Sequence, residues 1–283
     1  MSYFTVYTYQ FAPVNTDLLS LFQDEYSDAD KVWNNKQEVF STVYQKVVFR
    51  YRNTVYEHDT KYNENSIIVF KLANNKHLTQ EASFVAKKLE HHPSCYVIID
   101  NRKDVQNLFI EEDSYSFSES SVVANILQNS FNALLKPYGL VITIKKRYKS
   151  EEFWKYVSSM EDGVKMLRFS FLYPNLPRVQ EKIDEALARS SRQVRSKNTL
   201  IEYNSGEDES LNLSQDDNDL CNLVEAASIS GSEIKVRVNK MRRIKTIGET
   251  TETIEIDNLE ASLSADLLSS AAQKLISLLN RFK

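Results

Sequence analysis

The alternation of apolar and polar side chains constrains this chain more than any other feature of its sequence. Residues 3–11 (YFTVYTYQF) bring aromatic and β-branched side chains to alternate positions, which predicts a half-buried strand that ends before Pro13. Similar β-prone character returns in 45–52, 54–59 and 66–73, and short turns rich in Asn, Asp and Tyr separate these segments. We therefore expect the chain to begin as an antiparallel meander.

A hairpin and a long helix are predicted next. Residues 94–100 (SCYVIID) and 105–111 (VQNLFIE) are two β-prone runs on either side of the polar loop 101–104, an arrangement typical of a β-hairpin. Apolar residues then recur at helical spacing between residues 118 and 135. A turn containing Pro and Gly should end this helix before a strand at 140–147.

Helices and strands alternate more regularly after residue 150. The sequence predicts strands at 164–173 and 199–204, a hairpin from 233 to 257, and helices at 151–160, 178–192, 216–229 and 264–281, with a further helix-like stretch at 16–22 in the first half. The expected fold class is α+β with two domains, 1–149 and 150–283. The first would be mainly an antiparallel meander and hairpin with a long helix, and the second an antiparallel or mixed sheet covered by helices.

Composition limits the environment and the partners of the chain. Its 35 basic and 39 acidic side chains give a net charge of −4, so any attraction to nucleic acid must be local. Cys95 and Cys221 lie far apart and lack a C-x-x-C companion, which argues against a disulfide framework or a thiolate zinc site. No signal peptide and no apolar run of about 18 to 20 residues is present, so we expect a cytoplasmic protein without membrane insertion.

The most basic segment is 235–245 (KVRVNKMRRIK), with six cations in eleven residues. On a strand, Lys235 and Arg237 would share one face, and Ile234, Val236 and Val238 would take the other. Three acids on the predicted partner strand cannot neutralise six bases, although such a charge run is also typical of a solvated face. Four more cations lie on and after the helix predicted at 178–192, so the candidate nucleic-acid-binding residues are Arg189, Arg192, Arg195, Lys197, Lys235, Arg237, Lys240, Arg242, Arg243 and Lys245.

Enzymatic chemistry has little support in the sequence. Glu233 and Lys235 match the acid-x-Lys half of a restriction-type nuclease site, but the upstream acids at 216–219 fall at a predicted helix start rather than a strand end. No phosphate-binding or hydrolase string occurs, and the chain has only five glycines. We therefore predict no catalytic residue and no cofactor, with a metal-dependent nuclease as the alternative.

A metal site is not predicted either. His91, His92 and Cys95 offer donor atoms within five residues, but structural zinc needs four ligands and no second cluster is available. The acids of the predicted hairpin are too far apart to share an ion, because its register sets Asp100 opposite Val105 and Glu111 opposite Ser94.

A loop expected between residues 204 and 219 carries a concentration of negative charge. Two interpretations remain open: a solvated linker, or a segment that shields the basic hairpin by mimicking phosphate. If the loop occupied the basic face, a protein-interaction scaffold would become the better description. The six acids are Glu207, Asp208, Glu209, Asp216, Asp217 and Asp219.

The order of HHPSCYVIIDNRKDVQNLFIEED, the helix SSVVANILQNSFNALL, and then LVITIKK, FWKYV and VKMLRFSFLYPN resembles bacterial and prophage proteins of the RexA type, which serve phage exclusion or anti-phage defence. The resemblance covers residues 60 to 283 as a pattern of strands and helices and contains no catalytic motif. It implies a cytosolic homodimer that binds DNA with little sequence preference and acts with a partner protein. The sequence as a whole thus predicts a non-enzymatic nucleic-acid-binding protein, for DNA rather than RNA.

Overall fold

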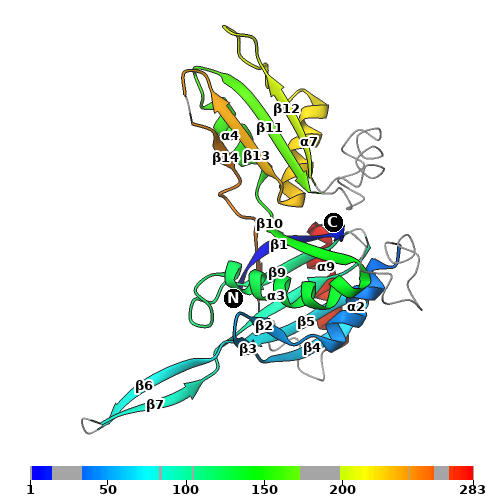
Figure 1. Ribbon diagram of the computed structural model, residues 1–283, viewed down its shortest axis with the longest axis vertical. Helices are drawn as coiled ribbons and strands as arrows, with labels where there is room; N and C mark the ends of the chain where they lie inside the picture. The colour runs from blue at the N-terminus through cyan, green and yellow to red at the C-terminus, as the bar shows by residue number, and fades with distance from the viewer. Residues whose placement is uncertain are drawn as a thin grey trace. The chain divides into compact units, whose positions relative to one another are not determined.

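A computed structural model describes residues 2–14, 34–82, 85–103, 105–172, 198–241, 243–257 and 268–282 (Figure 1). These residues form helices and antiparallel sheets, so the predicted α+β class is confirmed. The expected helices at 16–22 and 178–192 lie outside the described residues. Within the described ranges, no helix has both the length and the apolar character that crossing a bilayer requires.

The chain divides into two compact units. The first comprises residues 1–5, 13–144 and 253–283, and the second comprises residues 6–12 and 145–252. Two consecutive domains with a boundary after residue 149 are predicted from the sequence, whereas in the structure the carboxyl-terminal segment groups with the first unit.

A seven-stranded antiparallel sheet is the centre of the first unit, although residues 6–12 of β1 and 145–146 of β10 group with the second unit. Its strand order is β10-β1-β9-β8-β5-β4, and the seventh strand, β15, also pairs with β1, from Ser2 opposite Ile256 to Thr5 opposite Thr253. The strands are β1 (Ser2–Pro13), β4 (His58–Glu64), β5 (Ile67–Ala73), β8 (Ser94–Asp100), β9 (Asn107–Glu111), β10 (Leu140–Lys146) and β15 (Thr253–Ile256).

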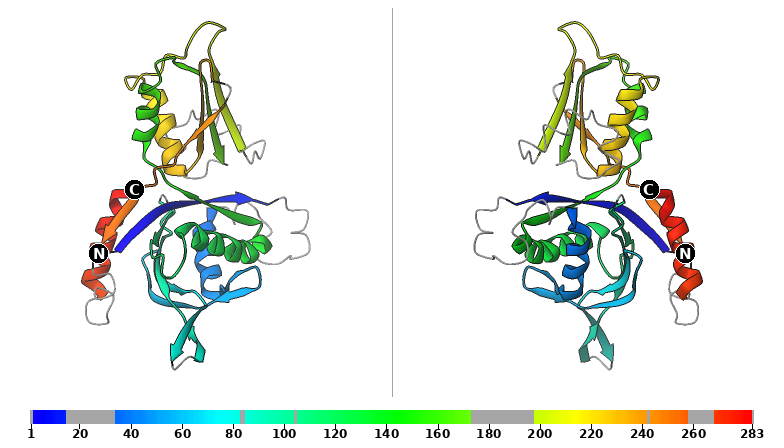
Figure 2. Two further views of the ribbon diagram at one scale, coloured as in Figure 1. Left: turned by 90° about the vertical axis from the view of Figure 1, so that its left-hand side faces the viewer. Right: turned by 90° about the vertical axis from the view of Figure 1, so that its right-hand side faces the viewer.

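Helices cover both faces of this sheet. Helices α2 (Lys36–Lys46) and α3 (Ser120–Leu135) lie on one face, and α9 (Leu268–Leu279) with the short helix η3 (Asn280–Phe282) lies on the other (Figure 2). Because neither face meets water at its centre, β8 is a nearly continuous apolar run, and all of its residues after Ser94 are buried.

Two parts of the first unit differ from the predicted meander. The segment predicted as a strand at 45–52 begins as the end of α2, whose Val39, Phe40, Val43 and Tyr44 bury one helical face, and only β2 (Phe49–Tyr51) is extended. β2 pairs with β3 (Thr54–Tyr56) in a separate small hairpin. A second hairpin, β6 (Lys76–Ala82) with β7 (Val85–His91), projects from the unit as a two-stranded ribbon that the sequence did not indicate (Figure 1).

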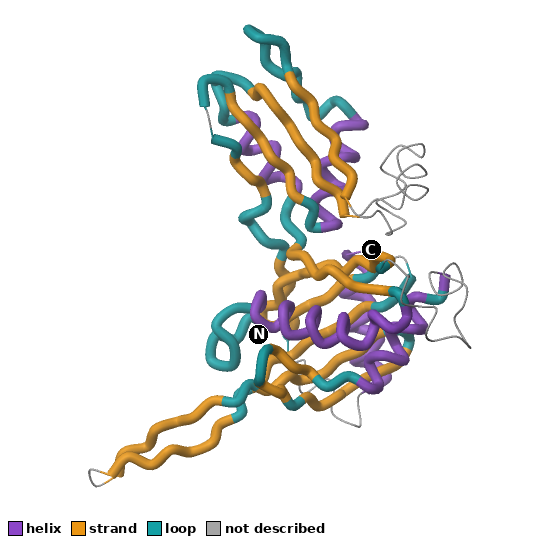
Figure 3. Tube along the Cα trace, viewed as in Figure 1, coloured by secondary structure: helices purple, strands orange, loops and turns teal. Residues whose placement is uncertain are grey.

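The second unit contains a four-stranded antiparallel sheet in the order β12-β11-β13-β14. Its elements are α4 (Ser150–Ser158), β11 (Val164–Leu172), β12 (Asn198–Asn204), α7 (Asn218–Ser230), β13 (Glu233–Val238) and β14 (Lys245–Ile247). Both helices lie on one face of the sheet (Figure 3). That face holds the core, in which Phe169 and Phe171 of β11 pack with Val224 of α7 and Ile234 of β13.

The hairpin predicted from 233 to 257 is only half correct. β13 pairs with β14, whereas β15 joins β1 in the first unit's sheet. A side chain explains where the pairing stops, because the Glu152 carboxylate of α4 accepts the backbone N–H groups of Gly248, Glu249 and Thr250 at 3.4, 3.1 and 2.8 Å. Backbone groups that bind a carboxylate cannot also extend a strand ladder.

Candidate nucleic-acid interface

The four-stranded sheet of the second unit has one face that neither α4 nor α7 covers, here called the open face. On β13, Ile234, Val236 and Val238 are buried in the core, so Glu233, Lys235 and Arg237 project to the opposite side. This confirms the predicted alternation along the strand. Two of the predicted cations therefore lie on the open face.

A third cation, Arg168 of β11, joins them and was missed by sequence reasoning. Arg168 lies between Glu202 of β12 and Lys235 of β13 in the strand register. Its guanidinium forms a salt bridge with Glu202, and both side chains remain 34% exposed. The alternation in β11, where Leu167 and Phe169 enter the core, was the signal that could have placed Arg168 on this face.

Two carboxylates reduce the positive charge of the open face. The pKa of Glu202 is lowered, first by the hydrogen bond from Asn204 and then by the one from Arg168. Glu233 pairs with Lys235 at 3.0 Å. Arg237 lies two residues beyond Lys235 on β13, opposite Met166 of β11. Its positive charge also favours the ionised form of Glu202.

Among the residues that the structure describes, three cations therefore outnumber two carboxylates on the open face. The Nε of Arg237 is buried and has no hydrogen-bond partner within the described part of the chain. Glu202 pairs with Arg168 and Glu233 with Lys235, whereas no described carboxylate forms a salt bridge with Arg237, so Arg237 is the cation of this face with the least local compensation and the one best able to pair with an incoming anion.

The turn between β13 and β14 carries further predicted cations. Lys240 and Arg243 are exposed, and Lys240 pairs with Asp162 at 2.5 Å. Lys245 belongs elsewhere, because it pairs in register with Val236 and its ammonium lies over the Tyr156 ring of α4, 5.5 Å from the centroid. The structure thus separates Lys245 from the open face. Arg189, Arg192, Arg195, Lys197 and Arg242 lie outside the described residues.

The acidic loop before α7 borders this end of the second unit. Leu211 forms a β-bridge with Val164, and Asn239 donates to the Ser210 hydroxyl at 2.9 Å. Gly163, at φ +73°, allows this close approach because a Cβ there would collide with Ser210. Between residues 205 and 219, no carboxylate forms an ion pair with a described cation of the open face, and Asp217 instead caps α7.

Among the described residues, the structure brings no second acid next to Glu233 and Lys235, the predicted half of a nuclease site. Glu233 and Lys235 pair with each other, and the other carboxylate of the open face, Glu202, lies across β11. Asp217 accepts the N–H groups of Asp219 and Leu220 as the N-cap of α7. Among the residues that the structure describes, no three His, Cys, Asp or Glu side chains could hold a metal ion.

The β8–β9 hairpin has a different register from the predicted one. Asp100 lies opposite Asn107, and Tyr96 donates its N–H to the Glu111 carboxylate at 2.8 Å. The loop is two residues longer because Val105 and Gln106 belong to it, and Gln106 adopts φ +48°. The two acids still lie at different ends of the hairpin, although the predicted partners Val105 and Ser94 are wrong.

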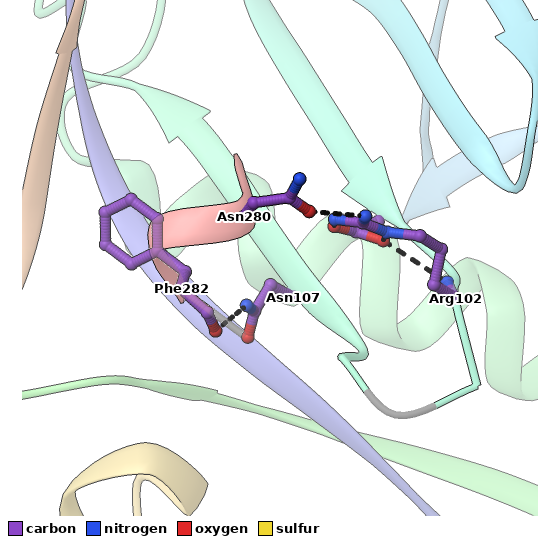
Figure 4. Close-up of polar contacts among 5 residues, drawn as sticks. Arg102, Asn107, Asn280 and Phe282 are labelled. Carbon is purple, nitrogen blue, oxygen red and sulfur yellow. Dashed lines mark hydrogen bonds and ion pairs between the residues drawn. The ribbon is translucent and has the colours of Figure 1, made fainter. Parts of the chain in front are cut away.

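Polar groups at this hairpin loop anchor the carboxyl-terminal segment of the first unit. Asp100 is fully buried and pairs with Arg102 at 2.5 Å, and Arg102 donates to Asn280 at 2.7 Å (Figure 4). Asn107 donates to the Phe282 carbonyl at 3.0 Å. These groups bind one another and therefore have a structural role.

No known protein family matches this chain, and no curated protein matches it. A functional assignment therefore depends on the chemistry of the open face and its borders.

Proposed function

We propose that the protein binds nucleic acid, DNA in particular, through the open face of its second unit, and that it does so without catalysing a reaction. The observation that carries this proposal is the clustering of Arg168, Lys235 and Arg237 on a sheet face that no described helix covers. Neighbouring strands lie about 4.8 Å apart and alternate residues on one strand about 6.6 Å apart, so the three cations form one compact patch.

The chemistry of this patch favours phosphate over bases. Arg and Lys neutralise backbone charge, and this contribution dominates sequence-independent binding to DNA. Glu202 and Glu233 offset part of the attraction. The expected affinity is that of non-specific binders, with a Kd on the order of 10⁻⁴ to 10⁻⁶ M at physiological salt.

The biological setting follows from the resemblance to phage-exclusion and anti-phage defence proteins. We place the protein in the cytoplasm as a homodimer that acts on DNA with a second protein. Binding with little sequence preference suits defence, because a protein that reads only the phosphate backbone can engage foreign DNA of any sequence.

The test is a fluorescence anisotropy titration of a labelled random duplex at low and rising salt. The variant R168Q/R237Q should weaken low-salt binding and reduce the slope of log K against log salt by about 2, since each phosphate contact contributes about 0.9. Lys155→Gln on α4 removes an exposed charge on the helix-covered side and should leave binding unchanged. Absence of binding to DNA and RNA at low salt would overturn the proposal.

A cleavage assay separates binding from the nuclease alternative. Plasmid and RNA incubated with the protein and Mg²⁺ or Mn²⁺ should remain intact. Cleavage that Glu233→Ala abolishes and Lys155→Gln retains would instead assign Glu233 a role in metal-assisted hydrolysis.

A further inference from the structure

The turn between β13 and β14 exposes apolar side chains among cations. Met241 is 54% exposed and Ile244 46% exposed, and exposed Lys240 and Arg243 lie beside them in the sequence. Single exposed apolar side chains are ordinary on a protein surface. Here, however, two large exposed apolar side chains lie on one cationic turn. The turn follows a strand that carries the proposed phosphate-binding residues, and this combination indicates a binding surface.

Hydrogen bonds and an ion pair hold residues 239–241, at the start of this turn. Asn239 donates its N–H to the Gly163 carbonyl at 3.0 Å, and Met241 donates its N–H to the Val238 carbonyl at 3.2 Å. Lys240 adopts the left-handed conformation with φ +61°, and its ammonium pairs with Asp162 at 2.5 Å. Because residues 239–241 are held in this way, binding through Met241 loses little backbone conformational entropy.

The side chains of the turn define the chemistry of its partner. An apolar side chain gains free energy by leaving water, whereas the exposed guanidinium of Arg243 beside Ile244 favours an anion nearby, since Lys240 already pairs with Asp162. The step between two stacked bases offers both, since it is apolar and has a phosphate on each side. DNA-bending proteins insert Met, Ile, Leu or Phe at such steps and pair cations with the adjoining backbone.

An anionic membrane is the other surface that combines apolar and negative character. The acidic loop argues against it, because Ser210 contacts Asn239 and exposed Glu207, Asp208 and Glu209 lie in the same loop. The loop and the turn lie at the same end of the second unit (Figure 1). A flat anionic surface that reaches the turn also meets these carboxylates, whereas a nucleic-acid duplex can approach from the open face.

We infer that Met241 and Ile244 insert between base pairs of the DNA held on the open face, so that the protein unstacks and bends the duplex it binds. This inference rests on the proposed function. Arg237 lies two residues before Asn239, where the turn begins after β13 ends at Val238, and a strand rises about 3.3 Å per residue, so a duplex bound at Arg237 also reaches the turn. Flexible pyrimidine–purine steps should be preferred, because they unstack most easily.

The experiment uses a short duplex with 2-aminopurine at a central TA step, since this base becomes more fluorescent when it unstacks. The full chain at saturating concentration and low salt should raise the fluorescence. The variant M241S/I244S should lose most of this rise and bind several-fold more weakly. Val48→Ser removes a comparably exposed apolar side chain, 58% exposed in the first unit, and should retain the rise. A thermal melt of M241S/I244S should match that of the unmodified protein, since both side chains lie on the surface.

The other outcomes distinguish the two proposals. DNA binding by the unmodified protein without any fluorescence rise would overturn the insertion and leave the proposed function standing. A rise that persists in M241S/I244S would also overturn it. No DNA binding would remove both proposals. Sedimentation with phosphatidylserine vesicles that the unmodified protein shows and M241S/I244S loses, with the DNA signal unchanged, would assign the turn to membranes instead.

Discussion

The two sheets of this protein differ in how many of their faces are covered. In the first unit, helices lie on both faces, and all but the first residue of β8 are buried. In the second unit, the two described helices lie on one face, and buried and accessible residues alternate along β13. A sheet covered on both sides stabilises the fold but offers no face to a ligand, whereas a sheet covered on one side can do both.

The same contrast holds for two arginine–carboxylate pairs. Asp100 of the first unit is fully buried in its pair with Arg102, and this arginine also contacts Asn280 near the end of the chain. Glu202 of the second unit is 34% exposed in its pair with Arg168. The first pair should therefore contribute to stability, whereas the second should contribute mainly to the charge of the open face.

The largest expected effect tests the buried pair. Arg102→Met leaves the Asp100 carboxylate buried without its partner, and the free energy of unfolding of the first unit should fall by about 3 to 5 kcal/mol. Urea unfolding measures this change. Arg168→Gln is the matched variant at the exposed pair and should change stability by about 0 to 1 kcal/mol.

A second variant identifies the cause of that loss. The double variant D100N/R102M removes the uncompensated charge and should recover much of the stability lost in Arg102→Met. If Arg102→Met and Arg168→Gln had equal small effects, the two pairs would not differ in the way their burial indicates.

The sequence anticipated the elements whose pattern is local. β1, β5, β8 and β11 follow from alternating or continuous apolar runs. The strand predicted at 45–52 was wrong at residues 45–46, which end α2, because Val47, Val48 and Phe49 follow them directly and give the whole window a β-prone composition. The mostly polar β6–β7 ribbon shows neither pattern.

The candidate site was predictable to a similar extent. The placement of Lys235 and Arg237 on one face can be predicted from the alternation of apolar and polar residues along a single strand. Arg168 joins them only because β11 pairs with both β12 and β13, which is a long-range property of the register. The assignment of Lys245 to the helix side also depends on its pairing with Val236, which composition does not reveal.

A smaller effect is expected at the exposed pair of the second unit. Glu202→Gln removes a negative charge from the open face, so DNA affinity at low salt should rise and the salt slope should steepen by up to about 0.9. Anisotropy titrations measure both. Glu225→Gln on α7 is an exposed acid on the helix-covered side and should change neither value.

The acidity of Glu202 determines how this effect depends on pH. Hydrogen bonds from Asn204 and then Arg168 lower the Glu202 pKa, so the carboxylate stays charged at and below the ordinary glutamate pKa of about 4.3. The affinity difference between the unmodified protein and Glu202→Gln should therefore persist at mildly acidic pH. A difference that disappears between about pH 6 and pH 5, above the ordinary glutamate pKa, would contradict the lowered pKa.

The smallest expected effect lies at the edge strand of the first unit's sheet. His58 of the edge strand β4 packs against Phe49, with ring centroids 4.9 Å apart. Burial lowers the pKa of His58, although the charge of Asp59 acts in the opposite direction. The unfolded chain therefore takes up a proton at a higher pH than the folded chain does, and the stability that neutral His58 contributes is lost as pH falls through the ordinary histidine pKa of about 6.5.

Thermal melts at about pH 7.5 and pH 5.5, on either side of that pKa, should show a larger loss of stability on acidification for the unmodified protein than for His58→Gln. An equal loss in both proteins would mean that the ring is as hydrated in the folded chain as in the unfolded one, and that the edge of the first unit's sheet is as open as the face of the second.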